Sequence, residues 1–409
     1  MTTRQEAPPG AAGAGEADVL RTMFVLATAA FASSASMRVT DALLPQLADQ
    51  FATTTGTAAI VITAFSLAYG LLQIIYGPIG DRFGKIATIA GGTALAGIAT
   101  MLAGFAGSFE MLVAMRFASG ATAAAIIPLA LAWIGDVVPY ERRQQTLARF
   151  MFGGITGLIF GQAAGGIVGD LVGWRAVFWM LGGLLLLTAA ALAFEVLSGR
   201  IPRRRSSSTP FGLHHMATGL AVLLARPWVR TIAAIVFWEG FLLNSALAFM
   251  GADLHHRFGL SLTASGLGLG LIGLGGAAYI VAARPLVRRL GEPGLARVGG
   301  LLAAIALAAF ALAPNWLVAL PAVFAAGLGF YMHHNTLQTN ATQMAPDARG
   351  SAVALFASSY FLGQAIGVAL VGAVVDRIGT VPVMLAAAAG VAVLALDYAR
   401  RLVRRAATD

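Results

Sequence analysis

The chain has 409 residues, of which 58% are hydrophobic and only 11% are charged, whereas an ordinary soluble domain carries roughly 25% charged residues. Cysteine is absent, which excludes disulfides, thiolate metal sites, iron–sulfur clusters and cysteine nucleophiles. The composition indicates an all-α membrane protein, because helices satisfy the backbone hydrogen bonds of such long apolar segments within lipid.

Apolar segments long enough to cross a bilayer, about 17–25 residues each, recur along nearly the whole chain. The first 18 residues are instead rich in Ala, Gly and Pro and lack a compact apolar stretch, so we expect a disordered tail rather than a signal peptide. We predict twelve membrane-spanning helices, at 22–46, 56–79, 86–106, 109–135, 146–169, 174–197, 229–253, 262–283, 294–314, 317–343, 352–375 and 379–398.

One substantial hydrophilic interruption, Ser198 to Arg230, has the basic, Ser/Pro-rich start that is typical of a cytoplasmic linker. A shift of 207 residues aligns the two sides of it, with Pro285 on Pro78 and Gly291 on Gly84, which indicates an internal duplication. Two six-helix bundles related by such a repeat are the plan of a transporter that rocks around a midplane site. The units expected are a cytoplasmic tail at 1–20, a six-helix bundle at 21–198, a linker at 199–228, a second six-helix bundle at 229–399 and a cytoplasmic tail at 400–409.

The formal net charge is +9, and the placement of the basic residues argues against a nucleic-acid partner. If the amino terminus is cytoplasmic, five arginines fall in the outer half and the other 22 of the 27 Lys and Arg residues fall in the inner half. This is the positive-inside bias, so both termini are expected in the cytoplasm, where basic residues meet anionic lipid headgroups. The five outer arginines are Arg38, Arg116, Arg175, Arg257 and Arg377.

The segment GPIGDRFGK, residues 77–85, places three charges between two long apolar stretches. It resembles the cytoplasmic loop signature between helices 2 and 3 of the major facilitator superfamily, with Ile79 and Gly80 in place of the usual Leu and Ala. The resemblance implies the major facilitator fold of two pseudo-symmetric six-helix bundles. A nucleotide-binding P-loop is excluded, because Ile79 and Ile86 replace its first glycine and its final Ser or Thr. The energy source is therefore expected to be a proton gradient, with no cofactor.

The acid of this loop lies near the partner bundle in the family. By resemblance, Asp81 faces the amino end of the eleventh helix near Ser351, where the helix dipole favours an anion, and does so only when the cytoplasmic side is closed. Asp81 would then act as a conformational latch, whereas Arg82 and Lys85 are adequately explained as solvated orientation signals. The latch residues are Gly77, Gly80, Asp81, Arg82, Gly84 and Lys85.

Two further stretches resemble coupling motifs of the superfamily. LVAMRFASGATAA, residues 112–124, is similar to the fourth-helix motif, and the resemblance implicates its arginine, Arg116, in proton coupling. RVTDALLP, residues 38–45, resembles the first helix of drug/proton antiporters, in which the acid, here Asp41, takes part in transport. The alternatives are a snorkelled or merely paired Arg116 and a local i,i+3 ion pair between Asp41 and Arg38.

The stretch GLIFGQAAGG resembles the fifth-helix antiporter motif, except that Gln162 stands where a proline is usual. Its glycines permit close contact between helices. The expected helix-packing residues are Gly157, Gly161, Gln162, Gly165 and Gly166. The resemblance as a whole covers about residues 20 to 400 and does not specify a substrate.

Glu239 lies about ten residues into the seventh predicted helix, near mid-depth. An ionisable group there costs roughly 2.5–3.5 kcal/mol on insertion scales and is a functional candidate by default. Glu239 is expected to bind a proton or a cationic substrate; the alternative is a hydrogen-bonded structural carboxyl. Together with Arg116 and Asp41 it forms the candidate proton-coupling set.

Polar residues gather in the tenth predicted helix, in the segment YMHHNTLQTN. His334 and Gln338 share one face, and Tyr331 and Asn335 form an adjacent strip. Because lipid would leave these groups unpaired, we expect them to line a cavity and to bind substrate together with Asn244. The alternative is interhelical hydrogen bonding. His333 and His334 point about 100° apart, so the pair by itself does not predict a metal site.

The sequence therefore predicts a secondary active transporter of the bacterial cytoplasmic (inner) membrane, monomeric, with protons and a small-molecule substrate as partners. A proton-coupled antiporter exporting a small amphipathic or drug-like molecule by alternating access is the leading hypothesis. A proton-coupled or facilitative carrier of a specific metabolite, either exporter or symporter, is the alternative. An enzyme is not expected, because the GxSxG and HExxH motifs are absent.

Overall fold

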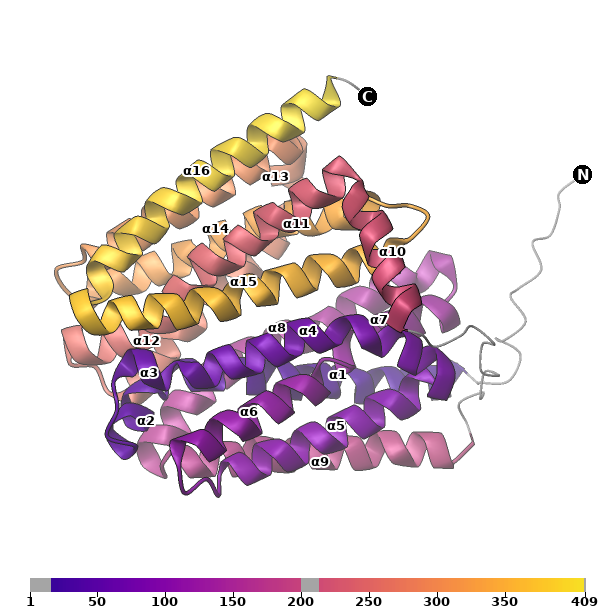
Figure 1. Cartoon of the computed structure of the whole chain (residues 1–409), viewed down its shortest axis with the longest axis horizontal. Helices are drawn as coiled ribbons and strands as arrows, with labels where there is room; N and C mark the ends of the chain where they lie inside the picture. The colour runs from indigo at the N-terminus through magenta and orange to yellow at the C-terminus, as the bar shows by residue number, and fades with distance from the viewer. Residues whose placement is uncertain (1–15, 200–212, 408–409) are drawn as a thin grey trace, which may run out of the picture.

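The computed structural model describes residues 16–199 and 213–407, so most of the expected amino-terminal tail and the start of the linker lie outside it. The described residues form helices and no strand, which confirms the all-α expectation (Figure 1). The helices are α1 (Glu16–Arg38), η1 (Val39–Asp41), α2 (Leu44–Gln50), α3 (Thr55–Ala58), α4 (Ile60–Phe83), α5 (Lys85–Ala103), α6 (Phe109–Ala123), α7 (Ile126–Val137), α8 (Tyr140–Leu171), α9 (Trp174–Leu197), α10 (Leu213–Ala225), α11 (Pro227–Glu239), η2 (Gly240–Asn244), α12 (Ser245–Phe258), α13 (Leu262–Ala311), α14 (Trp316–Gln343), α15 (Arg349–Ile378) and α16 (Thr380–Ala406).

Eleven helical stretches within the described residues are long and apolar enough to cross a membrane, one fewer than the twelve predicted. The difference arises in α13, which joins the eighth and ninth predicted helices into one stretch of 50 residues. The chain nevertheless turns at Gly291, whose φ of 63° lies in the left-handed region that glycine enters without steric cost. The two predicted spans therefore persist on either side of a turn at Gly291.

Three of the predicted spans are interrupted rather than continuous. The first passes from α1 through the short 3₁₀ helix η1 before α2 begins with Pro45 in its first turn. The fourth is divided between α6 and α7. The seventh contains η2, a single π-helical segment over Gly240–Asn244, directly after Glu239. Such π segments widen a helix locally and are common at functional sites.

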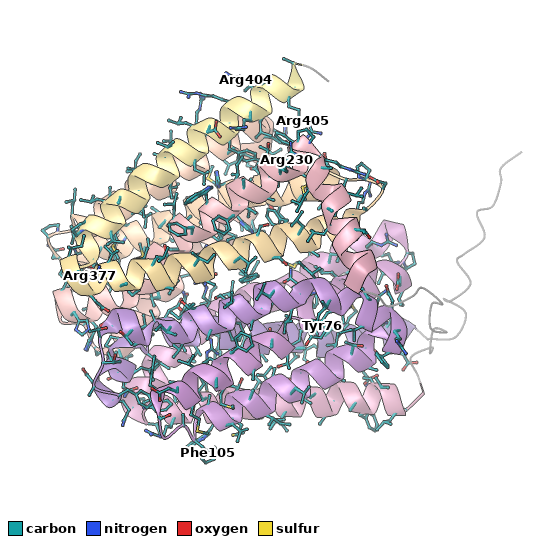
Figure 2. All side chains as sticks on the ribbon, in the orientation of Figure 1. Tyr76, Phe105, Arg230, Arg377, Arg404 and Arg405 are labelled. Carbon is teal, nitrogen blue, oxygen red and sulfur yellow. The ribbon has the colours of Figure 1, made fainter. Side chains whose placement is uncertain are left out.

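The segments outside the predicted spans are more helical than expected. The described part of the 199–228 linker contains α10, and α16 continues through the expected tail to Ala406. We call the end of the bundle at which α1 begins and α16 ends the inner end, and the opposite end the outer end. Arg230, Arg404 and Arg405 lie at the inner end and Arg377 lies at the outer end (Figure 2).

The two halves of the chain form two layers, α1–α9 below and α11–α16 above in Figure 1, and the helices of the second half slope away from the first toward the inner end. Extensive contacts join α8 to α13 and α4 to α15. At the outer end the halves are also tied by hydrogen bonds. The Asp376 carboxylate accepts the Gly56 N–H at 2.8 Å, and the Asp170 carboxylate accepts the Thr263 hydroxyl at 2.8 Å. The outer end is therefore closed in this structure.

Candidate functional site

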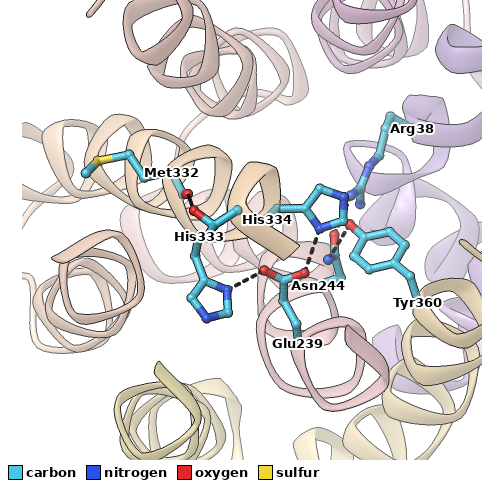
Figure 3. Close-up of polar contacts among 8 residues, drawn as sticks. Arg38, Glu239, Asn244, Met332, His333, His334 and Tyr360 are labelled. Atoms are coloured by element: carbon cyan, nitrogen blue, oxygen red, sulfur yellow. Dashed lines mark hydrogen bonds and ion pairs between the residues drawn. The ribbon is translucent and has the colours of Figure 1, made fainter. Parts of the chain in front are cut away.

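Glu239 ends α11 and is 1% exposed, with its carboxylate held between two imidazoles from α14 (Figure 3). One oxygen lies 2.7 Å from His333 Nδ1 and the other lies 2.6 Å from His334 Nδ1. Neighbouring side chains on a helix point about 100° apart, so the two rings approach the carboxylate from different sides. We call Glu239, His333 and His334 the Glu–His cluster.

The Glu–His cluster has a definite hydrogen-bond chemistry. An ionised carboxylate only accepts hydrogen bonds, so both Nδ1 atoms must carry hydrogen when Glu239 is charged. A neutral imidazole protonated at Nδ1 then has a bare Nε2 that can accept a further proton. One added proton converts an uncompensated buried charge into an ion pair of zero net charge, which greatly reduces the cost of burial. The cluster is therefore suited to take up and release one proton.

His334 lies in an aromatic setting. The centroids of the Phe330, Phe356 and Tyr360 rings are 5.1, 5.5 and 4.9 Å from that of the imidazole. Aromatic faces stabilise a nearby cation by about 0.5–2 kcal/mol. His334 therefore has aromatic rings on several sides, which can interact with a cation bound beside it.

A second polar group joins the two halves beside the Glu–His cluster. Asn244, the last residue of η2, accepts a hydrogen bond from Arg38 Nη2 at 2.5 Å and donates one to the Tyr360 hydroxyl at 2.6 Å (Figure 3). Arg38 also pairs with Asp41 at 3.3 Å, the i,i+3 arrangement expected from the sequence. Asn244 therefore links the charged pair of the first half to the aromatic residues of the second.

Arg116 is fully buried in the amino-terminal half, where it donates to the Ser36 carbonyl oxygen at 3.0 Å. Its guanidinium carbon lies 4.3 Å from the centroid of the Phe65 ring, and its Nε and Nη2 have no hydrogen-bond partner among the described residues. Arg116 and Asp41 interact electrostatically, whereas Glu239 belongs to the other half. The structure thus divides the three proton-coupling candidates into two groups rather than one.

The polar residues of α14 occupy two opposite faces. Tyr331, Asn335 and Gln338 lie on the partly exposed face, where Asn335 donates to the Tyr279 hydroxyl at 2.9 Å. Tyr331 interacts electrostatically with Arg38 of the other half, so this face is directed toward the amino-terminal half. We call Tyr331, Asn335 and Gln338 the gap-facing strip. His334 adjoins it, with 18% of its side chain exposed.

The loop motif at 77–85 is placed at the inner end. Gly84 adopts a φ of 93°, which ends α4, while Gly77 has open space beside its Cα and Gly80 packs against Leu129. Asp81 has a 54% exposed side chain and pairs with Lys85 at 3.5 Å, rather than with the amino end of α15 near Ser351. Lys85 has a closer partner in Asp136, at 2.5 Å. Arg82 lies over the ring of Phe83. Because the outer end is closed here, the expected latch contact belongs to the other state and stays a prediction.

The glycines of α8 form a stripe along α1. A Cβ at any of three of them would meet backbone atoms of α1 or η1 at 2.2–2.4 Å: Gly157 at Phe31, Gly161 at Ala35 and Gly165 at Val39. Gly166 is turned instead toward Leu262 and Gly266 of the other half. Gln162 is buried beside Asp41, with which it interacts electrostatically. The motif thus lies where α8 contacts both α1 and α13.

Sequence reasoning missed three members of the site: His333, Arg38 as a link between the halves, and Tyr360. A signal for His333 exists, since His333, Thr336 and Asn340 repeat at the i, i+3, i+7 spacing of one helix face. Tyr360 carried no comparable signal, because aromatic residues are ordinary core residues. No group of three His, Cys, Asp or Glu side chains in the described part of the chain is arranged to hold a metal ion.

Comparisons with known proteins agree with this arrangement. The sequence model of the Major Facilitator Superfamily matches residues 26–368. An uncharacterized MFS-type transporter, YceJ of Bacillus subtilis (strain 168), is 26% identical over 86% of each chain, and a chloramphenicol resistance protein of Streptomyces lividans is 26% identical over 84% of this chain and 86% of its own. The crystal structure of a bacterial homolog of the human lysosomal transporter Spinster superposes with a TM-score of 0.70 at 18% identity, covering 96% of both chains. The chain belongs to the Major Facilitator Superfamily and is a transporter rather than an enzyme.

Proposed function

We propose that the protein is a proton-coupled antiporter that exports a small amphipathic or drug-like molecule across the bacterial inner membrane. The inner end, which bears the basic residues, is cytoplasmic in this proposal, following the positive-inside rule. The protein acts as a monomer by alternating access, each half moving as a unit around the Glu–His cluster and the gap-facing strip. The resistance protein among its relatives supports drug-like substrates.

The observation that carries the proposal is the buried carboxylate with an imidazole on each oxygen, next to the Asn244–Arg38 link between the halves. Because His334 adjoins the gap-facing strip, a substrate bound there would compete electrostatically with a proton on the cluster. Binding of one proton makes the Glu–His cluster neutral, whereas its release returns the cluster to a net charge of −1. Binding of a proton and binding of a cationic substrate thereby disfavour each other, which supports exchange.

Vesicle transport tests the proposal. We would reconstitute the protein in vesicles with an acidic lumen and measure the uptake of ethidium, a lipophilic cation, and of chloramphenicol, a neutral amphipathic molecule. Glu239→Gln is expected to lower gradient-driven accumulation by about 100-fold, a typical contribution of a positioned proton-transfer group. Glu195→Gln is the matched control, since Glu195 is equally buried but pairs with Arg21 at 2.6 Å. Full accumulation in Glu239→Gln, or accumulation that survives collapse of the pH gradient and potential, would contradict proton coupling.

The substrate class is tested separately, by thermal unfolding in the presence of chemically diverse compounds. A compound that binds only the folded protein raises its stability by mass action. Stabilisation by many lipophilic cations and neutral amphipaths supports drug export. Stabilisation confined to one narrow group of metabolites would instead support a specific metabolite carrier.

A further inference from the structure

A second polar strip runs along the buried face of α14, opposite the gap-facing strip. It consists of His333, Thr336 and Asn340, which are 1%, 3% and 7% exposed. The strip begins at the Glu–His cluster, because His333 Nδ1 contacts Glu239. It ends toward the inner end, where Asn340 Nδ2 donates to the carboxylate of the exposed Glu292 at 3.2 Å. Seven residues of helix separate its two ends, roughly 10 Å.

Two buried polar atoms near the start of this strip have no hydrogen-bond partner among the described residues: His333 Nε2 and the Tyr398 hydroxyl. Their rings meet edge to face with centroids 5.7 Å apart. Gly300 leaves room for the imidazole, since a Cβ there would lie 3.1 Å from His333 Cδ2. Burying such atoms unpaired is costly, and a shared water would satisfy both.

Tyr398 is also coupled to the charged groups around it. It interacts electrostatically with Glu239, with Glu292 and with Arg405, so its hydroxyl is within electrostatic range of both the buried carboxylate and the exposed one. Arg405 lies over the Trp228 ring near the inner end. The hydroxyl can donate one hydrogen and accept another, which is the property a proton relay requires.

We propose that His333, Tyr398 and Glu292 carry protons between the Glu–His cluster and the inner end, through the interior of the carboxy-terminal bundle and apart from the substrate. This inference rests on the proposed proton coupling at Glu239. A proton leaves His333 Nε2 for a water molecule, a hydrogen of that water passes to the Tyr398 oxygen, and the original tyrosine hydrogen moves through a further water to the Glu292 carboxylate. His333 loses one proton, Glu292 gains one, and both waters and Tyr398 are regenerated.

Because the two strips lie on opposite faces of α14, the proton and the substrate can use different sides of the helix. Substrate can occupy the gap-facing side of α14 while the proton moves on the other side, so neither has to pass the other. The outer end is closed in this structure, so the route connects the cluster to the inner end alone and does not bridge the membrane. Asn340 acts as a positioning residue that holds Glu292 at the end of the strip.

A pH jump on the purified full-length protein in detergent tests the route without a known substrate. Proton uptake from pH 8 to pH 6 is followed in stopped flow with the dye pyranine, and the phase that Glu239→Gln removes is assigned to the Glu–His cluster. In Tyr398→Phe and in Glu292→Gln this phase is expected to slow by about tenfold or more, with the same amplitude. Tyr279→Phe, which removes a hydroxyl beside the gap-facing strip, is expected to leave the rate unchanged.

The outcomes separate the route from the function on which it depends. An unchanged rate in both Tyr398→Phe and Glu292→Gln overturns the route while leaving Glu239 as the proton site. Equal slowing in Tyr279→Phe also overturns it, because the effect would then follow from loss of any buried hydroxyl. If no phase disappears in Glu239→Gln, the proposed proton site itself is wrong and the route fails with it.

Discussion

Arg38 in the first half donates to the carboxamide oxygen of Asn244 in the second half at 2.5 Å. This bond can form only while Arg38 at the end of α1 and Asn244 of η2 are in contact, so it favours the outer-closed state. Hydrogen bonds to charged groups contribute roughly 1.5–3 kcal/mol. Asn244→Leu should therefore shift the population away from the outer-closed state by about tenfold, seen as longer distances between spin labels at the outer helix ends. Asn335→Leu, which breaks a bond within one half, is the control. An unchanged distance distribution in Asn244→Leu would show that the bond does not hold the state.

The outer closure is built twice, and the two helix starts that take part are related by the internal duplication. The Gly56 N–H, at the start of α3, is bound by Asp376 at the end of α15, and the Thr263 N–H, at the start of α13, is bound by Asp170 at the end of α8. Gly56 and Thr263 are 207 residues apart, which is the repeat offset. Each acid thus caps the amino end of a helix in the opposite half, where the helix dipole favours negative charge.

Asp170→Asn and Asp376→Asn should consequently weaken the outer-closed state to similar extents. We expect each to shift the population about fivefold, equivalent to about 1 kcal/mol, and the two effects to add in the double variant. Distances between spin labels on α3 and α15, and on α8 and α13, measure the opening. Asp397→Asn, which removes an acid paired with Arg401 on α16, should have no effect. A large effect from one acid and none from the other would mean that the closure is not symmetric.

Much of this architecture could be predicted because hydropathy and the repeat are both visible in one dimension. The spans follow from apolar length, and the turn at Gly291 follows from its alignment with Gly84. Glu239 stood out because a carboxyl within an apolar helix is costly, and the Arg38–Asp41 pair follows from i,i+3 spacing. Each of these signals can be obtained from the order of residues along the chain, without knowing how the helices pack.

The missing parts of the site depend on tertiary packing. Helix geometry separates His333 and His334 by 100°, and nothing in the sequence indicates that one carboxylate from another helix would reach both. The π segment after Glu239 was also unforeseen, because no proline or glycine pattern distinguishes it from an ordinary helix. The chemistry of Arg116 and Glu239 groups them as coupling candidates, although the sequence already assigns them to different halves. The sequence lacked the distances between side chains on different helices.

The exposed Asp81 gives a prediction about the opposite state. Its side chain is 54% exposed and pairs with Lys85 at 3.5 Å in the outer-closed structure, so neutralising it should cost little here. If Asp81 instead caps α15 when the inner end closes, Asp81→Asn should deplete the outward-open state. Distances between labelled inner helix ends report this shift. Asp136→Asn, which removes the closer partner of Lys85, should leave the distances unchanged. Identical distributions for wild type and Asp81→Asn would refute the latch.

The gap-facing strip predicts a loss of substrate affinity on removal of its amides. Gln338 is exposed on the face of α14 directed toward the other half, so a leucine there deprives a bound molecule of a hydrogen bond. Gln338→Leu is expected to raise the Kd of a stabilising compound from the thermal screen by about fivefold to tenfold. Gln343→Leu, at the inner end of the same helix, should leave Kd unchanged. An unaltered Kd with lowered stability in Gln338→Leu would favour a structural role for the strip.

The stabilising contribution of the ion pair between Arg226 and Asp347 should not depend on pH in the working range. The two guanidinium nitrogens Nη1 and Nη2 each bond one carboxylate oxygen at 2.6 Å, and this hydrogen bonding lowers the pKa of Asp347 to about 2. Because the folded pKa lies below the ordinary value of about 3.9, the stabilising contribution is complete above that value and is lost only as pH falls toward 2. The pair is therefore constant between pH 5 and pH 8.

Asp347→Asn should accordingly loosen the junction between α10 and α11 by the same amount at pH 6 and at pH 8. Hydrogen exchange of the amides near Arg226, corrected for the intrinsic pH dependence of exchange, measures this loosening. The pH profile of transport should keep its shape in this variant, because the proposed proton site is the Glu–His cluster and not this ion pair. Glu239→Gln should instead flatten that profile. A transport profile displaced along the pH axis by Asp347→Asn would assign part of the proton response to the inner-end ion pair rather than to Glu239.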